Sequence, residues 1–170
     1  MTTRRDEEFR SYVLTRRGEL LRSATLLAAG DRYLAEDLVQ STLTKLYIAW
    51  STFQRADNPN AYAQRALINA LVDEKRRAWR RYEHSCAELL ERPSQHTEGN
   101  SRTDEVWQAL GDLPPRMRAA VVLRYFHDLS VAETADVLGC EQGTVKSQTA
   151  RALDRLRSIL SPTPVDSRCA

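Results

Sequence analysis

A chain of 170 residues can form one ordinary domain or two small ones, and with only 7% aromatic residues its core must rely on Leu, Val and Ala. Six Gly, six Pro and the absence of alternating apolar runs exclude an all-β fold and favour an all-α fold. The formal net charge of +2 is too small to identify a nucleic-acid-binding protein, so the distribution of charge must be considered.

Two helices are predicted first, because apolar residues recur there at three- and four-residue steps. The first helix spans about residues 6–29, and Gly30 is its predicted C-cap. Asp31 is expected to cap the second helix, whose apolar stripe runs as far as Trp50.

The third helix is predicted from Asn58 and Pro59, an N-cap followed by Pro at the first helical position, and it extends to about residue 82. Residues 61–82 carry six basic and two acidic side chains, with Trp79 and Tyr82 between the arginines. Interleaved cations and aromatic rings suit a nucleic-acid strand with stacked bases. A basic C-terminus also simply favours the helix dipole, so both interpretations stay open.

Residues 83–105 reverse this charge, with six acidic and two basic side chains. Their polar, breaker-rich character predicts an acidic flexible linker at 85–102. The expected organisation is therefore an N-terminal helical domain at 1–84, a C-terminal helical domain at 103–162 and a tail at 163–170.

The C-terminal domain is predicted to begin with Thr103 as a cap, and Pro115 starts a further helix. Ser130 and Glu133 form a capping-box pattern that opens a short helix, and the last helix runs over about 142–160. Three residues stand at the spacing of a helix-turn-helix: Ala135, Gly139 and Val145. The second helix of such a unit enters the major groove of DNA.

The last helix has a predicted DNA-reading face and a predicted inward face. The reading face comprises Thr144, Lys146, Ser147, Gln148 and Arg151, with Gln142 beside them. The inward face comprises Val145, Ala152, Leu153, Leu156 and Leu160. Gln can bond adenine bidentately, and Lys and Arg bind guanine or phosphate. The alternative is a helical hairpin with a solvated charged face.

Three scattered cysteines without a CxxC pair argue against a disulfide framework, and no four-ligand zinc set is evident. We therefore expect reduced thiols, no metal site and no cofactor. No apolar run approaches the roughly 20 residues needed to span a bilayer, and no signal peptide opens the chain. The protein is expected in the cytoplasm, without membrane insertion.

A series of motifs runs along the chain in a fixed order. They are Ala35-Glu-Asp-Leu-Val-Gln-Ser41, Trp50, Asn58-Pro-Asn-Ala-Tyr62, Asn69-x3-Asp73-x2-Arg-Arg77, and Leu113-Pro-Pro-Arg-Met-Arg through Gly143-Thr-Val-Lys-Ser147. The series resembles regions 2.1 to 2.4 and region 4 of extracytoplasmic-function (ECF, group 4) RNA polymerase sigma factors of the sigma-70 family. The resemblance covers nearly the whole chain and is nearest to the actinobacterial SigE-like branch.

The resemblance implies a promoter-specific transcription initiation factor that contacts core RNA polymerase and both promoter elements. It assigns the polymerase β′ coiled coil to Asp37, Leu38 and Gln40, and region 4 to the β flap. It assigns −10 DNA to Asn69, Arg76, Arg77 and Arg80, and −35 DNA to the reading face defined above. The segment 51–58 corresponds to the loop that captures an unstacked −10 base.

For several of these residues a purely structural role remains an alternative to the functional one. Asp37 could be an ordinary solvated acid, and Asn69 could make a local helix hydrogen bond. Asp73 is expected to orient a neighbouring Arg, and Trp50 to lie in the core. Cys140 is either a redox site or, as we favour, a small buried turn residue.

The short tail leaves no room for a sensory domain, so we expect an anti-sigma factor as regulator. The main alternative function is a stand-alone helix-turn-helix regulator that binds an operator without polymerase. It leaves the N-terminal motifs unexplained. No nucleophile–base pair, Walker loop or HExxH motif is present in the sequence, so we predict that the protein is not an enzyme.

Overall fold

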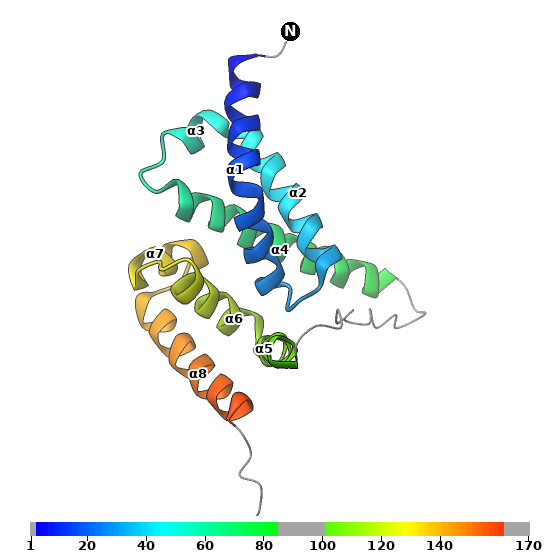
Figure 1. Ribbon diagram of the computed structural model, residues 1–170, viewed down its shortest axis with the longest axis vertical. Coiled ribbons are helices and arrows are strands. Elements are labelled where there is room, and N and C mark those ends of the chain that lie inside the picture. The colour runs from blue at the N-terminus through cyan, green and yellow to red at the C-terminus, as the bar shows by residue number, and fades with distance from the viewer. Residues whose placement is uncertain (1–2, 85–100, 162–170) are drawn as a thin grey trace, which may run out of the picture.

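The structure is a computed structural model that describes residues 3–84 and 101–161, with side chains described for 3–78 and 104–161. All regular secondary structure in these ranges is helical, which confirms the all-α prediction (Figure 1). The predicted tail lies outside the described residues, and so does the predicted linker apart from residues 101 and 102.

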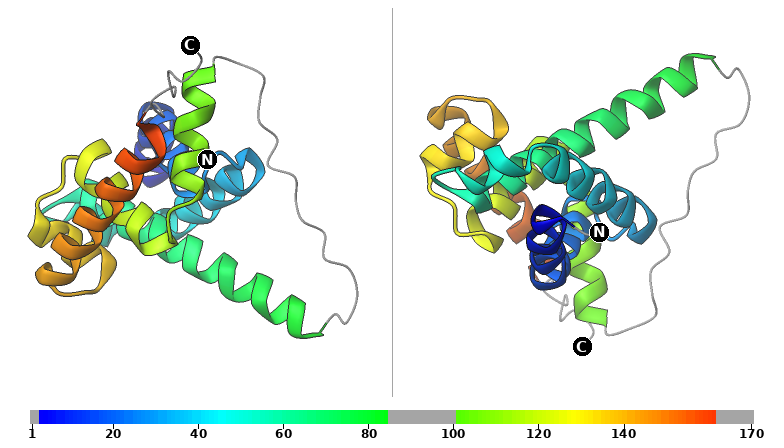
Figure 2. Two further views of the ribbon diagram at one scale, coloured as in Figure 1. Left: turned by 90° about the horizontal axis from the view of Figure 1, so that it is seen from below. Right: turned by 90° about the horizontal axis from the view of Figure 1, so that it is seen from above.

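Four helices form the N-terminal part: α1 (Arg4–Leu27), α2 (Arg32–Ile48), α3 (Trp50–Gln54) and α4 (Pro59–His84). α1 packs along α2, and α2 packs on α4. The C-terminal half of α4 extends away from the other helices, as both views of Figure 2 show. This half carries the basic residues that follow Asp73.

The N-terminal core consists of aliphatic side chains together with a group of aromatic rings. Leu27, Leu38 and Leu67 are among its fully buried members. Trp50 is 5% exposed and stacks on Phe53 with 5.3 Å between ring centroids. The prediction that Trp50 belongs to the core is confirmed.

The turn between α1 and α2 differs from the prediction. Ala28 is the C-cap of α1, and both Ala29 and Gly30 have positive φ angles, of 53° and 87°. The amide N–H of Gly30 bonds to the carbonyl oxygen of Thr25 at 2.9 Å, which closes the helix two residues before the expected end. The assignment of Gly30 as the C-cap was therefore wrong, because an alanine takes the first left-handed position.

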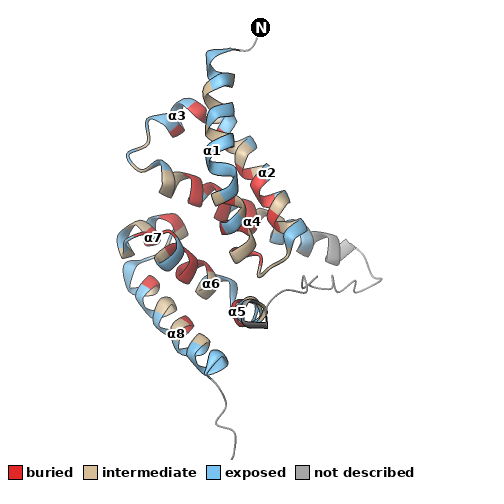
Figure 3. Ribbon diagram, viewed as in Figure 1, coloured by how far each residue is buried: buried red, intermediate tan, exposed pale blue. Residues whose placement is uncertain are grey.

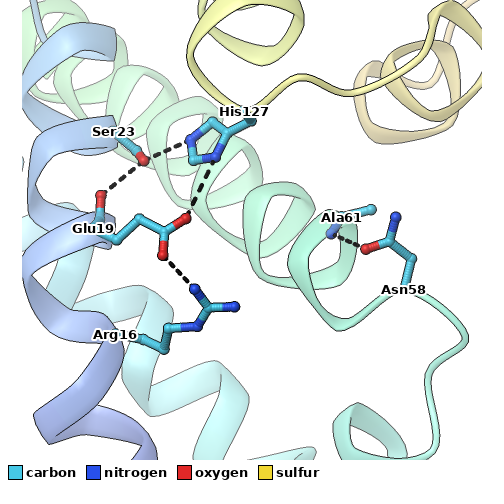
Figure 4. A network of polar contacts seen from close by, with 6 residues as sticks. All are labelled: Arg16, Glu19, Ser23, Asn58, Ala61 and His127. Carbon is cyan, nitrogen blue, oxygen red and sulfur yellow. Dashed lines mark hydrogen bonds and ion pairs between the residues drawn. The ribbon is translucent and has the colours of Figure 1, made fainter.

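The segment after α2 also differs from the prediction, because α3 turns the first part of the expected 51–58 loop into a short helix. The start of α4 is as predicted. Asn58 Oδ1 accepts a hydrogen bond from the Ala61 amide at 3.0 Å, and Pro59 is the first helical residue (Figure 4).

The C-terminal part comprises α5 (Ser101–Gly111), α6 (Pro115–Val121), the π-helical segment η1 (Val122–Phe126), α7 (Val131–Leu138) and α8 (Gln142–Leu160). α5 begins two residues before the predicted Thr103 cap. The capping box of Ser130 and Glu133 opens α7, and Gly139 ends it with a φ of 63°, both as predicted. Leu160 was expected to point inward but is 40% exposed, because α8 extends beyond its packing partners there.

The larger of two buried hydrophobic clusters among the described residues spans both parts of the chain. The main buried cluster includes Leu123, Leu129 and Val137 from the C-terminal part together with the leucines of α1, α2 and α4. η1 contacts α1, and α7 contacts α4. Figure 3 shows buried segments of α4, α6 and α7 along this boundary. In this structure, the two parts are packed against each other.

Candidate DNA and polymerase interfaces

One exposed face of α4 carries two of the predicted −10 residues, Asn69 and Arg76, together with Arg65, which the sequence did not assign to DNA. These three residues are spaced by four and seven positions, so they lie on the same side of the helix. All three are exposed. Arg77 is also exposed, and its guanidinium lies 3.8 Å from the Glu74 carboxylate. The Arg80 side chain is outside the described residues.

Asp73 of α4 forms an ion pair with Lys45 of α2. Lys45 Nζ lies 2.8 Å from Asp73 Oδ2, and this hydrogen bond is the main cause of the lowered pKa of Asp73. The charges of Arg76 and Arg77 lower the pKa of Asp73 further. Asp73 is therefore bonded to Lys45 rather than to the neighbouring Arg that the sequence suggested, and the pair ties α2 to α4.

The predicted polymerase residues divide between the surface of α2 and its core side. Asp37 and Gln40 are exposed, whereas Leu38 is 1% exposed and packs in the core. Leu38 therefore cannot meet a partner protein directly without repacking the domain. Asp37 and Arg77 line the same small hollow, so a residue assigned to polymerase and one assigned to DNA are neighbours there.

The helix-turn-helix prediction is matched by α7 and α8, which pack together around Val145. Lys146, Ser147 and Arg151 are exposed on α8, and Thr144 is half-buried. Gln148 is also half-buried. Its Oε1 atom is buried and has no hydrogen-bond partner among the described residues. The Gln148 side chain thus lies partly toward the interior, while Lys146, Ser147 and Arg151 remain accessible.

Cys140 lies in the turn between α7 and α8. Cys140 is half-buried, and its amide N–H bonds to the carbonyl oxygen of Ala135 at 3.0 Å. This contact completes the end of α7 and accounts for the position as part of a helix terminus.

A buried polar contact that the sequence did not predict joins α1 to the residues after η1 (Figure 4). Ser23 Oγ lies 2.7 Å from His127 Nε2, and His127 Nδ1 lies 3.9 Å from a Glu19 carboxylate oxygen. The Ser23 hydroxyl donates to the Glu19 carbonyl oxygen, so its oxygen can accept from His127. Burial lowers the pKa of His127, although the Glu19 and Asp128 carboxylates act in the opposite direction. Ser23 is fully buried, so this Ser–His–Glu arrangement is a packing contact.

A second unpredicted contact comes from Arg118 of α6. Its half-buried guanidinium donates to the carbonyl oxygens of Leu110, Gly111 and Leu113 at 2.8–3.1 Å, which fixes the corner between α5 and α6. It also donates to the carbonyl oxygen of Leu27 at 2.9 Å, at the end of α1. Burial lowers the pKa of Arg118. Residues 91 positions apart are joined in this way, and no local sequence signal predicts such a pair.

Comparison with known protein families assigns both parts of the chain. Residues 13–81 match the sigma-70 region 2 family, and residues 103–156 match the sigma-70 region 4 family. Two helical parts with a DNA-type helix-turn-helix in the second thus correspond to the two main regions of bacterial sigma factors.

Similarity to individual proteins indicates which group of sigma factors the chain belongs to. The chain is 39% identical to the RNA polymerase sigma-E factor of Streptomyces coelicolor over 162 residues, covering 95% of this chain and 90% of that protein. It is 30% identical to the ECF RNA polymerase sigma factor EcfG of Rhodopseudomonas palustris, covering 82% and 78% of the two chains. The chain belongs to the ECF sigma factors of the sigma-70 family and is similar to the Streptomyces sigma-E factors.

A solved structure is similar over both regions at once. It is that of the sigma factor RpoE in complex with the anti-sigma factor NepR from Bartonella quintana, with a TM-score of 0.79 and 28% sequence identity. The match covers 91% of this chain and 97% of that one. This chain therefore functions as an RNA polymerase sigma factor.

Within the described ranges 3–84 and 101–161, the helices include none with the length and apolar character needed to span a membrane.

Proposed function

We propose that the chain brings core RNA polymerase to promoters by dividing two promoter elements between its two domains, without catalysing a reaction itself. The observation that carries this proposal is the presence of two separate exposed basic helix faces. One lies on α4 in the region 2 part, and the other lies on α8 in the region 4 part. The domain division at 1–84, 85–102 and 103–162 is part of the same proposal.

The −10 element is assigned to α4 and to the segment before it. Asn69, Arg76 and Arg77 would contact the opened strand, with Arg80 continuing the basic surface. Segment 51–58 would hold an extruded base. Extrusion costs a few kcal/mol, so the pocket must recover that free energy through stacking and hydrogen bonds.

The −35 element is assigned to the exposed face of α8. Lys146, Ser147 and Arg151 would meet base edges or phosphates in the major groove, and Thr144 would contact the backbone near the start of the helix. Gln148 can join them only if its half-buried side chain turns outward, so we give it a secondary role.

Core polymerase is assigned to the exposed side of α2, where Asp37 and Gln40 would contact the β′ coiled coil. Leu38 would support this face from within the core. The β flap would contact region 4. We place the protein in the cytoplasm, with the polymerase on which it acts.

An anti-sigma factor is the proposed regulator. The support is the overall similarity to the Bartonella quintana sigma factor, whose structure was solved together with its anti-sigma factor NepR. The similarity extends over both domains.

A footprint with and without core polymerase tests the proposal. We expect protection of the −35 and −10 elements only when both the chain and core enzyme are present. Strong protection by the chain alone, at a single site, would instead favour the alternative function of a stand-alone operator-binding regulator.

A further inference from the structure

The first turns of α1 lie beside the end of α2 and the short helix α3 (Figure 1). The Arg5 guanidinium donates to the carbonyl oxygens of Tyr47 and Ile48, the last two residues of α2, and lies 4.6 Å from the centre of the Tyr47 ring. The Tyr47 hydroxyl donates to Asp6 Oδ1 at 2.6 Å, and this bond is the main cause of the lowered pKa of Asp6, about 2. Arg5 and Asp6 therefore hold α2 at its C-terminus, where the helix dipole also favours a cation.

α1 also contacts α3 directly. Gln54, the last residue of α3, donates its Nε2–H to Glu8 Oε2 at 2.9 Å, and this bond is the main cause of the lowered pKa of Glu8. The ring of Tyr12 packs edge-on against Phe53 of α3, with 5.0 Å between ring centroids. A charge-assisted hydrogen bond and aromatic packing therefore fix α3 on α1.

The aromatic contacts continue from α3 to a groove at the start of α4. Phe53 packs against Tyr62 with 5.7 Å between ring centroids, and Tyr62 lines a groove of about 570 Å³. Residues of α7 line another part of its wall. The same groove is lined by two residues of the proposed base-capturing segment, Asp57 and Asn58. That segment thus begins on α3, which α1 holds, and ends at the groove.

We propose that Arg5, Asp6 and Glu8 are positioning residues for base selection at the −10 element, acting through α3 and the end of α2. The inference rests on the proposed role of segment 51–58 in holding an extruded base. A binding site discriminates well only when supporting contacts hold its groups within about 0.5 Å of the productive geometry. The first turns of α1 supply such supporting contacts for segment 51–58.

These contacts can be removed without removing the core beneath them. Arg5 is exposed, and Glu8 is partly exposed, so truncation of either side chain leaves no large cavity. The exposed ion pair of Glu8 with Arg4 contributes little to stability. The packing of Phe9 on Trp50, with 5.2 Å between ring centroids, remains in place. We therefore expect their loss to loosen segment 51–58 without unfolding the domain.

The test uses the full chain with Arg5→Ala and Glu8→Ala together, which removes the bonds to α2 and to α3 and leaves the net charge unchanged. Glu7→Ala with Arg10→Ala is the matched control, because both residues are exposed on α1 and the same two charges are lost. Run-off transcription with core polymerase is measured on templates randomised over the −10 element. Selectivity is the ratio of initiation with the preferred base to initiation with the other bases at each position.

We expect the double variant to lose selectivity by about three- to tenfold at the −10 position that the wild type discriminates most strongly. Its selectivity at the −35 element and its affinity for core polymerase should equal those of the control. A purely structural role would lower initiation from all templates by one factor and leave the base ratios unchanged, and that result would overturn the proposal. Failure of the wild-type chain to initiate on any template would refute the proposed function instead.

Amide hydrogen exchange of the free chain tests the physical link without polymerase or DNA. Amides of segment 51–58 should exchange about three- to tenfold faster in the double variant than in the control, because local opening costs less free energy. Equal exchange rates in the two proteins would overturn the proposal.

Tyr47→Phe provides a second variant in case the double variant does not fold. It removes only the hydroxyl that donates to Asp6 and keeps the ring against Phe9, at 5.0 Å between centroids. The same base ratio should fall by about two- to fivefold, and an unchanged ratio would count against the proposal. Glu8→Gln should keep wild-type selectivity, because its amide oxygen can still accept from Gln54. A loss as large as that of the double variant would contradict the role of this contact.

Discussion

Arg118 makes the most concentrated set of polar contacts in the described part of the chain, and its removal gives a quantitative prediction. Four carbonyl oxygens accept from its guanidinium at 2.8–3.1 Å. A net hydrogen bond contributes about 0.5–1.5 kcal/mol, and some of these carbonyls regain water when the side chain is removed. We therefore expect Arg118→Ala to lower the free energy of unfolding by about 2–4 kcal/mol.

Thermal and urea unfolding of the full chain measure this loss. For a chain of this length, a loss of that size lowers Tm by about 5–15 °C. Arg118→Lys keeps the charge, but one ammonium group cannot reach four carbonyls, so at least half of the loss should remain. Arg116→Ala is the control, because Arg116 is exposed on the same helix, and it should change stability by less than about 0.5 kcal/mol. An Arg118→Ala variant as stable as this control would refute the reasoning.

Further predictions concern pH, DNA and polymerase. Burial lowers the pKa of His127 below its ordinary 6.5, so its contribution to stability is complete above that pH and declines as the pH falls toward the lowered value. His127→Gln should remove this part of the pH dependence of Tm, and an unchanged profile would contradict the assignment. Arg77→Ala should reduce promoter opening, measured by permanganate reactivity, several-fold more than it reduces binding to core polymerase. Equal losses of opening and of core binding would contradict the assignment of Arg77 to −10 DNA. Arg151→Ala should lower the salt slope of −35 binding by about 1 if it contacts a phosphate, and an unchanged slope excludes that contact. Asp37→Ala should weaken core-polymerase binding about tenfold, measured by fluorescence titration, and unchanged affinity would remove it from the interface.

Local signals in the sequence predicted the helix boundaries that depend on near neighbours. The N-cap at Asn58, the capping box of Ser130 and Glu133, and the left-handed Gly139 all involve residues within a few positions of one another. The turn after α1 escaped prediction because an alanine takes a positive φ there at a steric cost, which tertiary packing must offset.

The relation between the two domains could not be predicted. The Ser23–His127 contact joins positions 104 residues apart, and neither residue carries a local sign of the pairing. The burial of Leu38 agrees with its place in the apolar stripe predicted for the second helix, whereas its assignment to polymerase rested on the resemblance alone. The half-buried position of Gln148 could not be predicted, since packing against neighbouring helices sets the rotation of α8.

Run-off transcription with core polymerase on a promoter library tests most directly whether one chain serves two promoter elements. Initiation is expected only when the chain is added, from templates that share two separated sequence elements, with strand opening confined to the downstream one. Initiation that needs a single element, or none on any template in the presence of the chain, would contradict the division of the promoter between α4 and α8.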